Sequence, residues 1–197
     1  MKLVIGLVGE KGSGKGTFVK FLQQIAPKNS ISYVRYSDIL VETLNLWSLP
    51  LTRSNYQELA NTMEKTFGSG TFANATYNRT KNLSGKIIIL DGIRRFPEAE
   101  IIRKFPKSII IYITADAKIR YNNLKKRSDK LDEKGLSFAK FMKEEKNKAE
   151  VLIPKIGATA DFKIVNNGSL EEYRTQVEEF YRKYRFRIKS GMTRKVG

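Results

Sequence analysis

The sequence predicts an α/β fold with a parallel β-sheet covered by helices on both faces. Three observations predict it. Five short apolar runs, rich in β-branched residues, alternate with helical patterns along the chain, and near-continuous apolar strands are typical of a parallel sheet buried on both sides. A glycine-rich segment joins the first apolar run to a helix. The hydrophobic fraction of 41% is sufficient for a packed core in a single domain, 1–197. The predicted strands are 2–8, 31–36, 86–90, 108–113 and 162–165.

The segment after the first strand reads Gly9-Glu10-Lys11-Gly12-Ser13-Gly14-Lys15-Gly16-Thr17. Glycines allow successive backbone N–H groups to converge on an anion, and the start of the following helix adds the positive end of its dipole. Lys15 adds a mobile positive charge for the outer phosphates. A plain glycine-rich turn is the alternative, but the strand before and the helix after, 18–25, favour a nucleoside triphosphate site. We therefore expect Gly9, Gly12, Ser13, Gly14, Lys15, Gly16 and Thr17 to cradle ATP.

The remaining helices follow from capping signals and apolar spacing. Ser37 or Asp38 caps a helix to Leu44, and Thr52 caps the next. Pro97 opens a short helix, since proline is tolerated in a first turn. Ser169 and Glu172 form a capping box for the last helix. The predicted spans are 98–104, 116–127, 137–149 and 169–184.

Composition excludes several kinds of chemistry. The chain contains no cysteine and no histidine, so disulfides, thiol catalysis, histidine acid–base chemistry and Cys/His zinc sites are excluded. A metal must bind to oxygen atoms, which favours Mg2+. No run approaches the roughly 20 apolar residues of a membrane helix. The apolar start ends at Glu10 and Lys11, unlike a secretory signal, so we expect a cytoplasmic protein with no membrane partner.

Charged residues cluster where the third strand ends, in Asp91-Gly92-Ile93-Arg94-Arg95. Ligands of parallel α/β sheets bind at the carboxyl ends of the strands, so Asp91 is expected beside the glycine loop. It can hold Mg2+ through water. Arg94 and Arg95 can clamp an acceptor phosphate with paired hydrogen bonds, which lysine cannot do. The alternative is a strand-end turn with solvated arginines.

These motifs carry a family resemblance. Gly16 stands where most phosphate loops have Ser or Thr, and the Gly-Lys-Gly-Thr form resembles nucleoside monophosphate kinases. Asp-Gly-Ile-Arg resembles archaeal-type adenylate-kinase-like proteins, which are related to dephospho-CoA kinase. In the first group the metal is held largely through water. The resemblance therefore implies that Thr17 contacts phosphate rather than binding Mg2+ directly.

The resemblance implies a three-layer P-loop kinase fold with strand order 2-3-1-4-5. It also implies an acceptor subdomain at about 37–80 and a helical lid at about 120–145. Arg120 and Arg127 resemble the lid arginines, which close on the transferring phosphoryl group. Asn167 follows the last strand, where the family's backbone lies near the donor base. A glycine-containing turn would look the same.

The acceptor remains open at this stage. Asp38 matches an aspartate of adenylate kinase and of dephospho-CoA kinase, where it acts as a base on a ribose hydroxyl; it also suits a helix cap. Val41 and Ala99 stand where adenylate kinase has the arginine and glutamine that read AMP. Arg35 and Arg53 are candidates for the missing charge.

The chain carries a net charge of +17, which favours polyanionic ligands. Its tail, 181–197, interleaves aromatic and basic residues. That pattern suits stacking on single-stranded nucleic acid, but it suits equally a last helix that packs Tyr181, Tyr184 and Ile188 on the core. The sequence thus predicts an ATP- and Mg2+-dependent kinase of a nucleoside or deoxynucleoside monophosphate. The alternatives are a dephospho-CoA-kinase-like enzyme with Asp38 as base, and a nucleotide-switched nucleic-acid-binding protein.

Overall fold

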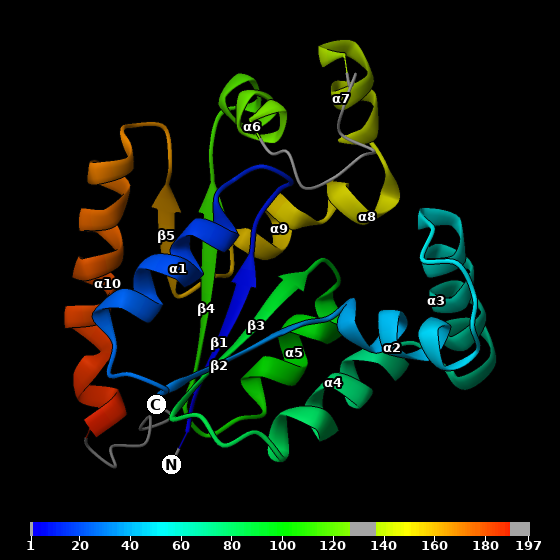
Figure 1. Cartoon of the computed structure of the whole chain (residues 1–197), viewed down its shortest axis with the longest axis horizontal. Helices are drawn as coiled ribbons and strands as arrows, with labels where there is room; N and C mark the ends of the chain where they lie inside the picture. Colours follow the sequence, from blue (N-terminus) through cyan, green and yellow to red (C-terminus); the bar gives the residue numbers. More distant parts are fainter. Residues whose placement is uncertain (1, 127–136, 190–197) are drawn as a thin grey trace.

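The centre of the molecule is a parallel β-sheet (Figure 1). The computed structural model describes residues 2–126 and 137–189. Within them lie the strands β1 (Leu3–Val8), β2 (Ile31–Arg35), β3 (Ile87–Ile93), β4 (Ser108–Thr114) and β5 (Phe162–Val165). Their order across the sheet is β2-β3-β1-β4-β5, with parallel neighbours throughout. The predicted fold class and strand order are therefore confirmed.

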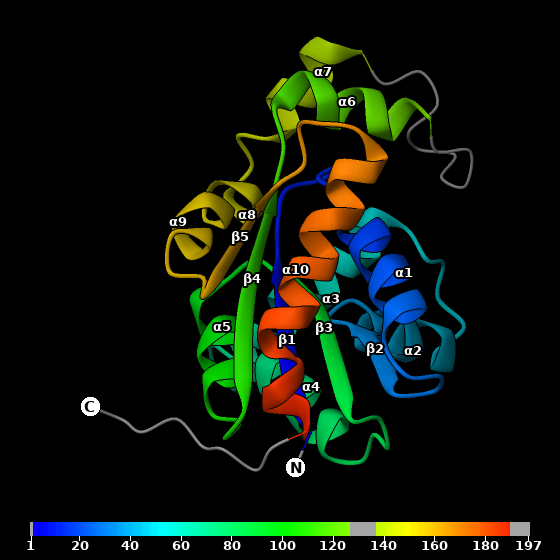
Figure 2. The same cartoon turned by 90° about the vertical axis from the view of Figure 1, so that its left-hand side faces the viewer.

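Helices cover both faces of this sheet, which gives three layers (Figure 2). Helices α1 and α10 pack on one face, and α5 and α9 pack on the other. The helices of the described residues are α1 (Lys15–Ile25), α2 (Asp38–Leu46), α3 (Arg53–Phe67), α4 (Thr71–Lys81), α5 (Phe96–Arg103), α6 (Ala117–Lys125), α7 (Phe138–Glu144), α8 (Lys148–Val151), α9 (Ile153–Gly157) and α10 (Leu170–Lys189).

The central strand β1 sends its side chains alternately into two apolar clusters. Leu3, Ile5 and Leu7 pack with α1 and α10, whereas Val4 and Val8 pack with α5 and α9. Every residue of β1 is buried as a result. This explains why the first apolar run is continuous rather than alternating, because no face of the strand meets water.

Two predicted helix starts are confirmed by their hydrogen bonds. The Thr52 hydroxyl accepts a bond from the backbone N–H of Asn55 (3.1 Å) at the start of α3. At α10 the Glu172 N–H donates to the Ser169 hydroxyl (3.1 Å), while the Ser169 N–H donates to the Glu172 carboxylate (2.6 Å). These side chains satisfy backbone groups that the first helical turn leaves unpaired.

Several elements differ from the sequence prediction, among them the last helix, which runs to Lys189. Helix α4 was not predicted, because its buried face consists of Ala73, Thr76 and Thr80, which carry little apolar signal. The expected helix 137–149 is interrupted after α7, and Asn147, in extended conformation, precedes α8. Strand β3 continues three residues beyond the predicted end at position 90, so Asp91 lies within it and pairs with Leu7.

The last helix packs part of its aromatic content against the core. Tyr184 is buried in the apolar cluster between the sheet and α10, and Tyr181 packs against the same cluster, as the core-packing alternative expects. The side chain of Ile188, like residues 190–197, lies outside the described part. Arg127 and the rest of 127–136, part of the expected lid, also lie outside it. Among the described helices, none combines the length and apolar character of a membrane span.

Candidate nucleotide-binding site

The glycine loop connects β1 to α1 in a conformation that depends on glycine. Gly12 has φ +81° and Gly14 has φ +104°, in the left-handed region where other residues are strained. A Cβ on Gly12 would lie 2.4 Å from the carbonyl oxygen of Arg120, and one on Gly14 would lie 2.5 Å from the Asn166 amide nitrogen. The loop is therefore packed tightly against α6 and the segment after β5.

Three side chains hold the carbonyl groups of this loop. Asn123 Nδ2 donates to Gly12 O, Asn166 Nδ2 donates to Ser13 O, and Tyr173 Oη donates to Gly14 O, each at 3.0 Å. They come from α6, the β5–α10 segment and α10. Sequence reasoning missed all three, because the bonds join segments more than 100 residues apart. Fixing the carbonyls in this way leaves the loop a preorganised set of amide groups, as anion binding requires.

Lys15 is the first residue of α1, and its ammonium group folds back over the loop. Nζ donates to the carbonyl oxygens of Gly9 (2.6 Å) and Glu10 (3.0 Å). Burial lowers the pKa of Lys15, and the nearby carboxylate of Asp91 partly offsets that effect. A partly buried cation at a helix start, held by two carbonyls, is poised to bind an anion that replaces them.

Asp91 lies near Lys15, within β3 and two residues before its last residue, Ile93. It is buried, with 9% of its surface exposed. Its Oδ2 accepts a hydrogen bond from the Tyr33 hydroxyl on β2 (2.6 Å), while Oδ1 has no partner among the described residues. The hydrogen bond was not predicted, although the parallel pairing of Arg35 with Asp91 places Tyr33 two residues away on the neighbouring strand.

The free Oδ1 suits a hydrated Mg2+, because a metal-bound water can donate to it. Within residues 2–126 and 137–189, no group of three or more acidic residues is placed to hold a metal by itself. The residues present therefore fit an ion that is carried mainly by nucleotide phosphates.

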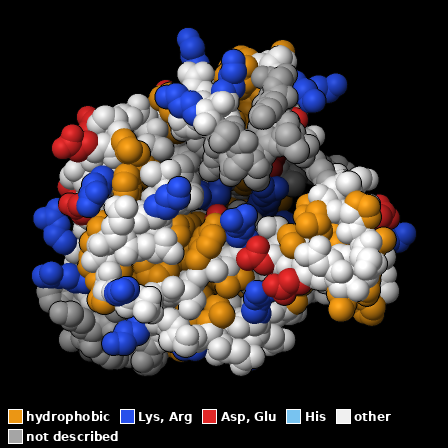
Figure 3. Space-filling view, viewed as in Figure 1, with side chains coloured by type: hydrophobic (Ala, Val, Ile, Leu, Met, Phe, Trp, Pro, Cys, Tyr) orange, Lys and Arg blue, Asp and Glu red, His pale blue; other side chains and the backbone are white. Residues whose placement is uncertain are grey.

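Arg94 and Arg95 follow β3 directly and point to different helices. Their backbone N–H groups donate to one Glu98 oxygen at 2.6 and 3.1 Å, which fixes the start of α5. The Arg94 guanidinium lies 3.2 Å from Glu150 on α8, and the Arg95 guanidinium lies 3.3 Å from Glu64 on α3. Basic and acidic side chains gather in the hollow of this face (Figure 3).

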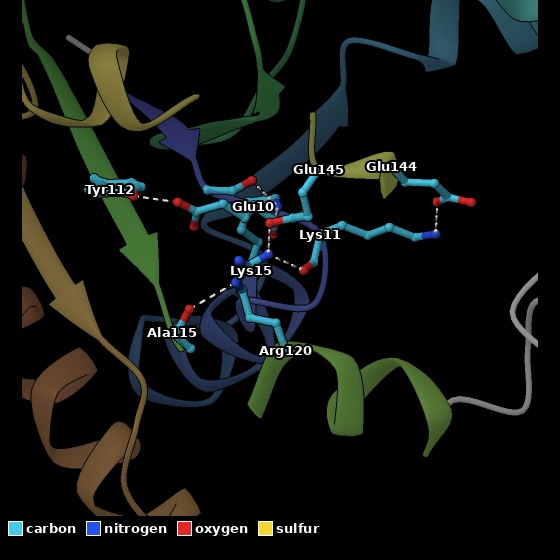
Figure 4. A network of polar contacts seen from close by, with 9 residues as sticks. Glu10, Lys11, Lys15, Tyr112, Ala115, Arg120, Glu144 and Glu145 are labelled. Carbon is cyan, nitrogen blue, oxygen red and sulfur yellow. Dashed lines mark hydrogen bonds and ion pairs between the residues drawn. The ribbon is translucent and has the colours of Figure 1, made fainter. Parts of the chain in front are cut away.

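Arg120 reaches the glycine loop from α6. It is 7% exposed, and its Nε donates to the Ala115 carbonyl at 2.8 Å. Its Nη1 lies 2.6 Å from the Glu145 carboxylate and 3.4 Å from the Lys11 carbonyl oxygen (Figure 4). Burial raises the pKa of Glu145, and the Arg120 hydrogen bond partly offsets this. Next to this pair, Lys11 Nζ lies 3.6 Å from Glu144.

Two further predicted residues make structural contacts. Asp38 opens α2, and its Oδ2 accepts a bond from the Arg35 backbone N–H (2.8 Å). The Asn167 side-chain oxygen accepts a bond from the Asp116 backbone N–H (2.8 Å), before α6. Thr17 lies in the first turn of α1, and the side chain of Arg53 lies outside the described residues. The structure thus brings Lys15, Asp91, Arg94 and Arg120 to one edge of the sheet around the loop.

Solved structures with the same fold include kinases. The chain aligns with TT1252 from Thermus thermophilus at a TM-score of 0.60 and 16% identity, covering 92% of this chain and 97% of that one. It aligns with shikimate kinase from Bacteroides thetaiotaomicron at 0.60 and 12% identity, covering 93% and 98%. These similarities show the fold, which is that of P-loop kinases.

Sequence relatives come from archaea. One is a UPF0200 protein of Staphylothermus marinus, 28% identical over 87% of this chain and 88% of the relative. Another, from Methanocaldococcus jannaschii, is 29% identical over 93% and 96%. The family described as an AAA domain, AAA_17, matches residues 8–138, which include the whole glycine loop, Asp91 and Arg120. The chain therefore belongs to the AAA_17 family and has a P-loop kinase fold.

Proposed function

We propose that this protein is an ATP- and Mg2+-dependent kinase that transfers the γ-phosphoryl group to a nucleoside or deoxynucleoside monophosphate. The observation that carries the proposal is the convergence of Lys15, Asp91 and Arg94 at the carboxyl edge of the sheet, beside a glycine loop. Asp91 raises and Arg94 lowers the pKa of Lys15 through their charges, so both lie near its ammonium group. A cation, a metal-holding carboxylate and an acceptor-binding cation are what transfer between two phosphates requires.

Each residue then has a defined task. The loop amides and Lys15 bind the β- and γ-phosphates, and Asp91 Oδ1 holds a water of the magnesium shell. Mg2+ supplies charge neutralisation on the phosphate oxygens. Arg120 adds its guanidinium to the transferring phosphoryl group, and Arg127 is proposed to join it from the lid. Phosphoryl transfer depends mainly on such positioning and charge stabilisation.

The phosphate acceptor is argued from Arg94 and Arg95. The two arginines follow each other at the strand end, and each guanidinium can bind phosphate through paired hydrogen bonds, which favours a substrate that already carries a phosphate. Asp38 makes a backbone hydrogen bond at the start of α2. Neither Ser37 nor Asp38 caps α2 through its side chain, as the sequence had suggested, and the contact of Asp38 with Arg35 does not require it to act as a base, which is consistent with a phosphate acceptor. The region 37–80, with α2, α3 and α4, is proposed to enclose the acceptor.

The test is a transfer assay with purified protein, ATP and Mg2+. The acceptor panel consists of nucleoside monophosphates, deoxynucleoside monophosphates, dephospho-CoA and shikimate, and products are separated by ion-exchange chromatography. We expect a monophosphate to become a diphosphate, and Lys15→Ala to abolish the reaction. A phosphorylated hydroxyl acceptor would replace the proposed substrate class. No product with any acceptor would contradict the kinase assignment.

A further inference from the structure

A second carboxylate lies inside the glycine loop itself. Glu10 is the second residue of the loop and is only 7% exposed. One of its oxygens, Oε1, accepts a hydrogen bond from the Tyr112 hydroxyl on β4. The other, Oε2, is buried and has no partner in the described part of the chain. An acidic side chain in a loop that binds phosphate opposes that binding, so its presence calls for an explanation.

Glu10 and Asp91 are arranged alike on the two sides of β1. Asp91 lies on β3 and pairs with Leu7, while Tyr112 lies on β4 and pairs with Val8. Each carboxylate is anchored through one oxygen by a tyrosine, and each keeps a second buried oxygen without a partner among the described residues. Both act on the ammonium group of Lys15. Figure 4 shows Glu10 between Tyr112 and Lys15.

The anchoring keeps the Glu10 carboxylate available as an acceptor. The Tyr112 hydroxyl donates to Glu10 Oε1 and holds that oxygen in place. The buried Oε2 then presents a lone pair and negative charge with no hydrogen-bond donor bound to it among the described residues, which is unfavourable unless a hydrated cation supplies one.

We propose that Glu10 is a second carboxylate for the nucleotide-bound divalent cation, and that Glu10 Oε2 and Asp91 Oδ1 both accept hydrogen bonds from its hydration shell. Magnesium sites typically combine one or two carboxylates with substrate phosphates and retained waters. No described acidic cluster holds a metal alone. The cation is therefore expected to bind together with the nucleotide and not before it. This inference rests on the nucleotide and metal site of the proposed function, but not on its acceptor.

The test uses Mn2+ as a paramagnetic probe and a non-hydrolysable ATP analogue. Electron paramagnetic resonance titration gives the Mn2+ affinity of the protein–nucleotide complex, and calorimetry in EDTA gives the affinity for the metal-free nucleotide. Glu10→Gln keeps an oxygen for Tyr112 and removes the charge. We expect it to weaken Mn2+ binding by about tenfold, as loss of outer-shell ligands does. Binding of the metal-free nucleotide should be unchanged or tighter, because a repelling charge is lost.

Two further variants distinguish the effect of the Glu10 charge on Mn2+ binding from an effect on folding. Glu179→Gln removes an equal charge from an exposed position on α10 and should retain wild-type Mn2+ affinity. Tyr112→Phe keeps the Glu10 charge and should bind Mn2+ within about twofold of wild type, whether or not Glu10→Gln folds stably. Unchanged Mn2+ affinity in Glu10→Gln overturns the proposal, and so does a tenfold loss in Tyr112→Phe. Because no acceptor is present, these results are independent of whether the monophosphate assay succeeds.

Discussion

The guanidinium of Arg120 lies 2.6 Å from the carboxylate of Glu145, and both side chains are largely removed from water. Two parallel contacts flank this pair, Lys11 with Glu144 and Arg94 with Glu150. Lys11 lies in the glycine loop, and the proposed reaction assigns Arg94 to the acceptor phosphate. Each of these cations is paired with a glutamate, from α7 and α8 respectively. The space between Lys11 and these carboxylates measures about 20 Å3, enough for a water and not for a phosphate. We therefore predict that these glutamates compete with nucleotide for the same cations.

Glu145→Gln should consequently bind ATP more tightly. Removing the competing charge leaves Arg120 buried without its counter-ion, so the free protein becomes less stable. A bound phosphate would supply the missing negative charge and restore that stability. We expect about fivefold tighter binding, a common size for coupling between two ligands of one group. Calorimetric titration with the ATP analogue measures it. Glu178→Gln, which breaks the exposed pair with Arg174 at 3.1 Å, serves as control and should change nothing. Equal or weaker binding in Glu145→Gln would refute the competition.

Asp38→Asn distinguishes the two kinds of acceptor. Asparagine retains the oxygen that accepts the Arg35 N–H bond (2.8 Å), so the start of α2 should be preserved. A phosphate acceptor is already ionised and needs no base, and turnover should stay within about threefold of wild type. A hydroxyl acceptor that used Asp38 as base would lose about 100-fold or more. Initial rates at saturating substrates decide between them, with a thermal melt to confirm that the variant is folded.

Arg95→Lys tests recognition of the acceptor phosphate. Lysine keeps the charge but loses the planar pair of donors, so we expect KM for the acceptor to rise by about tenfold while KM for ATP is unchanged. Steady-state kinetics with each substrate varied separately gives both constants. The matched control is Arg174→Lys, since Arg174 pairs with Glu178 at 3.1 Å on an exposed face of α10, outside the proposed acceptor region. If KM for ATP rises instead, Arg95 belongs to the donor side.

The fold was largely predictable, because its information is local. Buried strands such as β1 read as apolar runs, and the Ser169–Glu172 capping box is visible in four residues. Strand order needed the family resemblance, since pairing between distant strands leaves no periodic signal. Helix α4 was missed because threonines fill its buried face, and a hydroxyl that bonds its own helix, as Thr80 does, packs like an apolar group.

The sequence was sufficient to predict the main charged residues of the candidate site, but not the residues that contact them. The glycine loop and the Asp-Gly-Ile-Arg run indicate Lys15, Asp91 and Arg94 from the sequence, because phosphate binding favours lysine and arginine and a hydrated Mg2+ favours a carboxylate beside them. The partners Tyr112 and Glu145 depend on which helices and strands the tertiary fold brings near. An acidic residue within the glycine loop is, however, a signal that could have directed attention to Glu10 from the sequence alone.

Gly12→Ala should separate backbone strain from close packing against α6. A Cβ there would lie 2.4 Å from the Arg120 carbonyl oxygen, so the loop or α6 must move. Gly70→Ala is the matched control, because Gly70 is in the left-handed region with φ +92° and its added Cβ would meet only Pro97, at an ordinary contact distance of 3.7 Å. Both variants should lose about 1–2 kcal/mol of unfolding free energy to the left-handed backbone, measured by urea denaturation.

Only Gly12→Ala should also lose binding of the ATP analogue, by about tenfold or more, since a displaced loop misplaces its amide groups. Its intrinsic fluorescence should also change, because Tyr121 lies on α6 next to the contact. Wild-type nucleotide affinity in Gly12→Ala would mean that α6 yields without disturbing the loop. In that case Arg120 would influence nucleotide binding through its ion pair with Glu145, and not through the contact of its carbonyl group with Gly12.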